Sequence, residues 1–269
     1  MKMKLARTAL NAIILLSLLF LAGVAANAWQ RSQDVAAYGE LAEQRSDQLA
    51  EEPPELPKTL YTHKENKSRK WLEINEDFVG WLCIPGTRID YPVVLGKDNS
   101  EYLAKDFKGK KSFAGSIFMD YRNLGDGSDP HIIIYGHSMK NGTMFGDLEL
   151  FRDSAFFREN SLVQLSWIFG DKEYRIFSVY EVSADDYAFT LDFEGSNDFT
   201  AYLKQIEALS AHGQASPAAP ITAEEPVGSL LTLVTCSYGV KNGRVVIHAL
   251  EVPGKEVSQE MALKPADSP

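Results

Sequence analysis

The chain has 269 residues, enough for one large domain or two small ones, and its 45% apolar and 24% charged content is ordinary for a globular protein. Three of the 27 Lys and Arg residues precede residue 30 but all 37 acidic residues follow it, which leaves a formal charge of about −13 on the rest of the chain. This acidity argues against a nucleic-acid partner, which requires a basic face. Two cysteines, Cys83 and Cys236, are too few for a disulfide-dense scaffold.

The N-terminus has the pattern of a membrane anchor. Residues 9–29 contain no charged side chain and are about long enough to cross a bilayer as a helix. Lys2, Lys4 and Arg7 precede them, so the positive-inside rule predicts that residues 1–8 are cytoplasmic and that the rest of this single-pass membrane protein is extracellular. A cleaved signal peptide is the alternative, because Ala26-Asn27-Ala28 resembles a cleavage site. The apolar stretch is longer than the usual roughly 7–15 residues of a signal peptide, which favours an uncleaved anchor.

A polar, helix-favouring segment follows the anchor and ends at a proline cluster. Residues 30–50 are rich in Ala, Glu, Gln and Leu, and Pro53, Pro54 and Pro57 cannot continue a helix. We therefore predict a stalk and linker over residues 30–59, a single globular domain over 60–254 and a polar tail over 255–269.

The globular domain is predicted to be mainly β. Apolar, β-rich runs punctuated by turn residues occupy 78–84, 89–95, 116–119, 131–135, 162–169, 173–182, 229–236 and, directly after Arg244, 245–249. Gly170-Asp171 is predicted as a hairpin turn, and apolar residues at helical spacing predict one helix over 199–209. Many short strands with few helices favour a closed or nearly closed β-structure.

The last two runs form a predicted hairpin with a chemical pattern. The first ends at Cys236, and Arg244 begins the second, after a loop that closes with Asn242-Gly243. A guanidinium close to a thiol favours the thiolate, which is the nucleophilic form. The hairpin is therefore the expected centre of the chemistry.

A cysteine nucleophile needs a proton partner, most often a histidine brought near in space. His137 follows the apolar run 132–135 directly after Gly136, which would permit a sharp turn, and catalytic groups concentrate at strand ends. The other four histidines are interpreted as structural or exposed bystanders: His63, His131, His212 and His248.

Several motifs, in order along the chain, resemble those of sortases, the membrane-anchored cysteine transpeptidases of Gram-positive cell walls. They are Tyr135-Gly136-His137, residues 142–148 (GTMFGDL), residues 232–236 (TLVTC) and Arg244. Class B sortases in particular are similar at residues 78–82, 84–87, 89–94, 115–123 and the helix near 199–209. The resemblance covers roughly residues 60–252.

The resemblance implies an eight-stranded β-barrel with peripheral helices and a site without metal or organic cofactor. It implies Cys236 as nucleophile, His137 as proton donor and acceptor, and Arg244 as stabiliser of the substrate carbonyl or oxyanion. By motif position, four further residues are expected at the substrate groove: Asn99, Leu103, Thr190 and Thr235.

The implied reaction cleaves the C-terminal sorting signal of an exported protein after Thr, through a thioester. The acyl group then passes to an amino group of a peptidoglycan precursor, or to a pilin lysine. Two other functions stay open. A cysteine hydrolase of wall peptides would need no Arg244, and a non-catalytic anchored binding module would tolerate Cys236→Ala.

Two positions depart from the class B pattern. Val234 stands where members commonly carry Ser, so any polar contact of that side chain is absent. Cys83 occupies a strand position where another residue is expected, and we interpret it as a small buried hydrophobe, not as a disulfide partner of Cys236.

Overall fold

The computed structural model describes residues 2–50, 67–168, 170–183, 188–213, 228–236 and 243–252, with side chains described for 13–48, 70–235 and 243–252 inside these ranges. The proline cluster, the predicted tail 255–269, His63, the loop 237–242 and the side chain of Cys236 lie outside the described residues.

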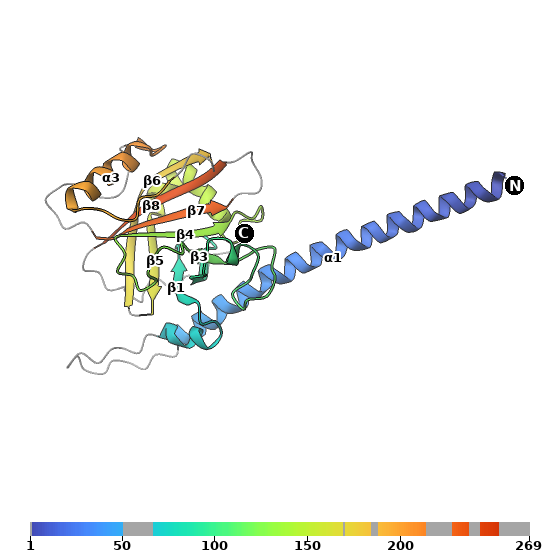
Figure 1. The fold of residues 1–269 in the computed structure, drawn as a ribbon, viewed down its shortest axis with the longest axis horizontal. Coiled ribbons are helices and arrows are strands. Elements are labelled where there is room, and N and C mark those ends of the chain that lie inside the picture. Colours follow the sequence, from blue (N-terminus) through green and yellow to red (C-terminus); the bar gives the residue numbers. More distant parts are fainter. Residues whose placement is uncertain are drawn as a thin grey trace.

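Among the described residues, eight strands close into a barrel in the order β1-β2-β3-β4-β7-β8-β6-β5 (Figure 1). The strands are β1 (Phe78–Cys83), β2 (Asp90–Val94), β3 (Ile117–Met119), β4 (His131–His137), β5 (Leu162–Trp167), β6 (Gly170–Ser183), β7 (Leu230–Cys236) and β8 (Gly243–Glu251). The predicted barrel is confirmed. The turn predicted at Gly170-Asp171 is wrong, because both residues already pair within β6, with Trp167 and Ser166 of β5.

Strands β4 and β7 lie side by side and run parallel, from the pair His131↔Leu230 to the pair His137↔Cys236. Every residue of β4 is buried, as are the first six of β7. Continuous burial explains why both segments are nearly uninterrupted apolar runs and do not alternate between polar and apolar residues.

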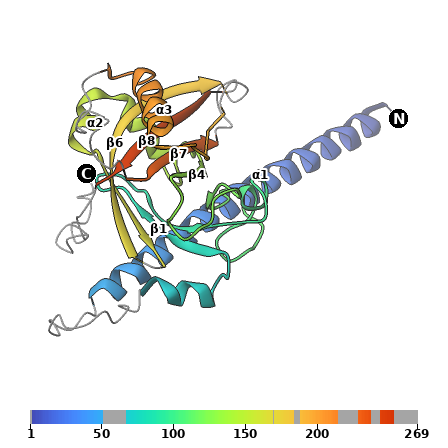
Figure 2. The ribbon, with the colours of Figure 1, turned by 60° about the vertical axis from the view of Figure 1, so that its left-hand side comes forward.

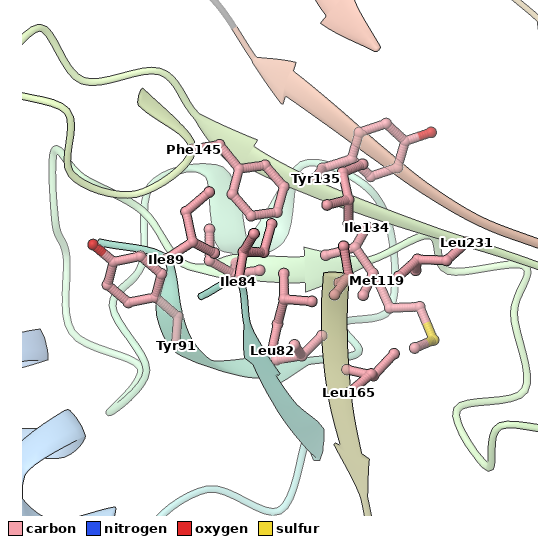
Figure 3. Close-up of a cluster of buried hydrophobic side chains, with 14 of the residues drawn as sticks. Leu82, Ile84, Ile89, Tyr91, Met119, Ile134, Tyr135, Phe145, Leu165 and Leu231 are labelled. Carbon is pink, nitrogen blue, oxygen red and sulfur yellow. The ribbon is translucent and has the colours of Figure 1, made fainter. Parts of the chain in front are cut away.

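The barrel interior holds the core. Leu82, Ile134, Leu165 and Leu231 come from four different strands, are fully buried and lie within one cluster in Figure 3. Such packing resists deformation and holds the strand ends at fixed relative positions.

Helices cover the outside of the barrel. The described ones are α1 (Lys2–Ala50), η1 (Lys67–Glu73), η2 (Glu101–Leu103), η3 (Gly146–Arg152), α2 (Ser154–Glu159) and α3 (Ser196–Ala208). The predicted helix at 199–209 is α3, which buries Phe199, Leu203 and Ile206 against Phe177 of β6 and Leu230 of β7. Sequence periodicity therefore located the helix but placed its start three residues late.

Helix α1 is uninterrupted from the apolar segment to residue 50, and its C-terminal half lies against the barrel (Figure 2). Its apolar window is long enough to cross a membrane and is not buried in the protein. Farther along, Tyr38 and Leu41 are buried in the barrel's core cluster, and Arg45 pairs with Asp90 of β2 at 2.7 Å. Part of the segment predicted as a stalk, 30–59, therefore packs on the globular domain.

Candidate active site

His137 is the last residue of β4, and only 2% of it is exposed. Its Nε2 lies 2.7 Å from the backbone oxygen of Leu103. Because a carbonyl oxygen can only accept, Nε2 carries a proton and the neutral ring has its lone pair on Nδ1. A backbone carbonyl thus orients the imidazole.

Two glycines make room for this ring and its strand. A Cβ on Gly115 would lie 2.8 Å from the oxygens of Tyr102 and Leu103 and 3.1 Å from Cδ2 of His137. A Cβ on Gly136 would lie 2.5 Å from Ile117 and 2.8 Å from the Phe145 ring. The sharp turn expected at Gly136 is absent, since this residue pairs with Thr235 inside the sheet. Close packing is what requires glycine there.

Cys236 is the last residue of β7 and is the register partner of His137. Neighbouring strands are about 4.8 Å apart, so the two backbones are adjacent although 99 positions separate them in the sequence. The structure brings these two predicted residues together at one end of the barrel.

Arg244 is the second residue of β8 and lies beside the same end of β7. Its guanidinium donates to the backbone oxygen of Thr235 across 3.2 Å. The Thr235 side chain is 1% exposed, and its hydroxyl accepts from the backbone N–H of Val245 at 2.9 Å. Thr235 therefore braces β7 against β8, and its expected contact with substrate stays a prediction.

Asn99 lies near Leu103 and is held by a buried acidic residue that the sequence analysis did not single out. Its amide donates to Asp120 at 3.1 Å, and its oxygen accepts from the backbone N–H of Tyr121 at 3.0 Å. Asp120 is fully buried and also accepts from Arg122 at 2.8 Å and from the Tyr135 hydroxyl at 3.0 Å. Burial works to raise the pKa of Asp120, but these hydrogen bonds outweigh it and lower the pKa.

Thr190, together with Arg122, lines a cavity of about 500 Å³. The residues around this cavity are Arg122, Asp129, Pro130, Phe189, Thr190, Leu191 and Asp192. The Thr190 backbone oxygen lies beside His131, the first residue of β4, whereas His137 is the last. The expected contact of Thr190 with substrate stays a prediction.

A chain of hydrogen bonds across four strands supports the Thr190 backbone. Tyr180 Oη lies 3.0 Å from His248 Nε2, and His248 Nδ1 lies 2.7 Å from the Thr232 hydroxyl. The same hydroxyl lies 2.7 Å from His131 Nε2, and His131 Nδ1 lies 2.6 Å from the Thr190 oxygen. The Thr190 oxygen can only accept, so His131 Nδ1 donates to it. With both imidazoles neutral, the Thr232 hydroxyl then donates to His131 Nε2, His248 Nδ1 donates to that hydroxyl, and Tyr180 donates to His248 Nε2. Burial lowers the pKa of His131 to about 4 and holds that of His248 well below its usual value.

Cys83 is the second cysteine of the chain and lies in β1, away from His137 and Cys236. Cys83 is free, and burial is the main cause that raises its pKa to about 11. Among the described residues, no three His, Cys, Asp or Glu side chains gather as metal ligands.

Comparison with known proteins gives concordant results. Residues 82–252 match the family model described as "Sortase domain". Sortase B of Listeria monocytogenes is 37% identical over 181 residues, which cover 66% of this chain and 71% of that protein. Sortase B of Staphylococcus aureus is 31% identical over 179 residues, with the same coverage.

Solved structures agree. A Staphylococcus aureus sortase B–substrate complex superposes with a TM-score of 0.72 at 27% identity, covering 86% of this chain and all of that one. Clostridium perfringens sortase B superposes with a TM-score of 0.61 at 37% identity, covering 68% of this chain and 98% of that one.

Proposed function

This chain belongs to the sortase family as a sortase B, a cysteine transpeptidase, and we propose that Cys236, His137 and Arg244 carry out its reaction. We propose a substrate that is an exported protein with a C-terminal sorting signal, cleaved after Thr, and an acceptor amine on a peptidoglycan precursor. The observation that carries the proposal is the parallel register His137↔Cys236, with Arg244 bonded to the residue before the cysteine.

In the first step the Cys236 thiolate attacks the threonine carbonyl carbon. A C–S bond forms and the C–N bond to the rest of the signal breaks. Protonated His137 gives its Nδ1 proton to the departing amine, and Arg244 holds the negative charge that develops on the carbonyl oxygen. A thioester acyl-enzyme remains.

In the second step the acceptor amine attacks the thioester. A C–N bond forms, the C–S bond breaks, and neutral His137 takes a proton from the amine. The Leu103 oxygen can accept from Nε2 in both protonation states, so the ring keeps its orientation through the cycle. The product is a protein joined to the wall precursor by an amide bond.

The location follows from the anchor. We propose that α1 spans the cell membrane once with residues 1–8 in the cytoplasm, so that the barrel faces the wall where both substrates are found.

Acyl-enzyme trapping tests the scheme. The full chain is mixed with a sorting-signal peptide, with and without an amine acceptor, and followed by intact-protein mass spectrometry. We expect a thioester adduct on Cys236 that the amine discharges faster than water does. Cys236→Ala should abolish the adduct, whereas Cys83→Ala should retain it. An adduct discharged equally fast without amine would favour the hydrolase, and full activity of Cys236→Ala would favour a binding module.

A further inference from the structure

We propose that the lysine-rich loop of residues 105–113 contacts the anionic lipid headgroups of the membrane that α1 crosses. This surface plays no part in the chemistry above and rests only on the proposed membrane anchoring. Below, residues 105–113 are called the basic loop.

The basic loop is attached to α1 close to the point where the helix leaves the apolar segment. Asp34 accepts from the Ser112 hydroxyl at 3.2 Å and from the backbone N–H of Phe113 at 3.0 Å. One turn earlier, the Arg31 guanidinium lies 4.1 Å from the centre of the Phe113 ring. In both ribbon views teal-to-green loops lie beside α1 (Figures 1 and 2).

The rise per residue of α1 gives the distance of this attachment from the membrane surface. The apolar segment ends at Trp29, a residue type that favours the membrane interface. With a rise of about 1.5 Å per residue, Arg31 lies about 3 Å and Asp34 about 8 Å beyond Trp29 along the helix. The headgroup layer is about 5–8 Å thick on each side, and charges act over about 8 Å at physiological salt. The loop therefore lies within reach of the headgroups.

The exposed side chains of the basic loop suit an anionic lipid surface. Lys108, Lys110 and Lys111 are exposed, and Phe113 is 46% exposed. The acidic residue of the loop, Asp106, accepts the backbone N–H groups of Lys108 and Lys110 and so shapes the turn. Three ammonium groups beside an aromatic ring contrast with the acidity of the exported region as a whole. Lysines near an anionic bilayer are favourable, and an exposed apolar ring can bury itself at the membrane interface.

The contact would also set the height of the active site. The basic loop begins two residues after Leu103, whose backbone oxygen orients His137. Tyr38 of α1 donates to the oxygen of Gly115, the residue that packs on the same ring. A loop resting on the membrane would therefore hold the His137 side of the barrel close to the lipid surface.

Lysine labelling of the unmodified full chain tests the contact. The protein is placed in phosphatidylcholine nanodiscs with or without phosphatidylglycerol, treated with a water-soluble acylating reagent and analysed by peptide mass spectrometry. We expect Lys108, Lys110 and Lys111 to be acylated at least about threefold more slowly in the anionic discs. Lys204, exposed on α3 away from α1, should react equally in both. Equal rates at the loop lysines would overturn the proposal.

A second arm separates the lipid from a soluble polyanion. Inorganic polyphosphate is added to phosphatidylcholine discs, and acylation of the loop lysines is measured again. If polyphosphate slows acylation as much as anionic discs do, the loop binds a wall polymer and the lipid proposal is overturned. In a third arm, a lipid with a photoreactive headgroup should cross-link to residues 105–113 of the wild type.

The charge-reversed variant Lys108→Glu/Lys110→Glu/Lys111→Glu should lose most of that cross-linking, and the control Lys204→Glu/Arg158→Glu should keep it. Undiminished cross-linking of the charge-reversed variant would contradict an electrostatic contact. None of these readouts depends on transpeptidation, and recovery of the intact chain in the discs checks the anchoring separately.

Discussion

At the residue scale, the orientation of His137 depends on the backbone oxygen of Leu103, which the imidazole can reach because the neighbouring residue 115 is glycine. Gly115 adopts φ +61°, and a side chain there would meet the Leu103 oxygen that accepts from the imidazole. The imidazole is therefore oriented by a main-chain group, in contrast to the carboxylate or amide that orients histidine in many cysteine hydrolases.

We predict that Gly115→Ala lowers kcat/KM at least about tenfold, because the new methyl group displaces the Leu103 oxygen or the ring. Gly109→Ala is the matched control. Gly109 has φ +74° but nothing within 4 Å of an added Cβ, so this variant has only the backbone penalty of about 1 kcal/mol. Kinetics and thermal melts of the two variants check the prediction, and equal loss of activity in both would contradict it.

Arg244 has two possible effects, one on the thiol and one on the substrate oxygen, and Arg244→Lys separates them. A lysine keeps the charge that favours the thiolate but loses the planar fork. We expect kcat/KM to fall about 100-fold, as for loss of one oxyanion donor, with the rate of Cys236 alkylation nearly unchanged. Cys83, with its raised pKa, should not interfere at neutral pH. Activity that survives the substitution would assign Arg244 to the thiol instead.

At the scale of elements, α1 is part of the folded domain as well as an anchor. The buried hydroxyl of Tyr38 donates to the Gly115 oxygen at 2.6 Å and accepts from the Phe107 N–H at 3.1 Å. The helix thereby ties the basic loop, through Phe107, to the segment that follows it, through Gly115. The domain start predicted at residue 60 stays a prediction, but these contacts begin well before it.

Tyr38→Phe should lower the stability of the whole domain, because it leaves a buried N–H and a buried carbonyl without this partner. We expect a loss of about 1–3 kcal/mol, which for a domain of this size is about 2–12 °C in Tm. Tyr121→Phe, at a residue that is 53% exposed, serves as the control and should melt like the wild type. A Tyr38→Phe melt within 1 °C of the control, roughly, would show that this docking contributes little.

At the scale of the whole molecule, two buried neutral histidines couple folding to pH. Burial lowers the pKa of His131 to about 4 and holds that of His248 well below its usual value, so the unfolded chain binds protons that the folded chain excludes. Stability is then fully present above about pH 6.5 and is lost as pH falls toward 4.

We predict that the free energy of unfolding drops by about 2 kcal/mol from His131 alone between pH 7 and pH 5. Denaturant titrations at pH 7, 6 and 5 measure this drop in a range where most carboxylates stay ionised. Thr232→Val removes the hydroxyl between both rings and should destabilise the protein at every pH. A free energy of unfolding that is constant from pH 7 to pH 5 would contradict neutral buried imidazoles.

The amino-acid sequence alone was enough to predict the β-rich runs along the chain, the helix at α3, the apolar segment of α1 and the identity of the candidate residues. These features depend on local periodicity, on turn residues and on motifs whose order matches a family. Cys236, His137 and Arg244 could be named because their residue types are chemically distinctive and stand at the ends of recognisable runs.

The atoms that those residues contact follow from the folded barrel. The Leu103 oxygen that orients His137, the buried Asp120 behind Asn99, and the Tyr38 hydroxyl on Gly115 join positions that are 34, 21 and 77 residues apart. Two of these partners are backbone oxygens, which every residue carries and no sequence pattern marks. Strand register and helix docking place them, because both are set by packing over the whole barrel and not by neighbouring residues in the chain.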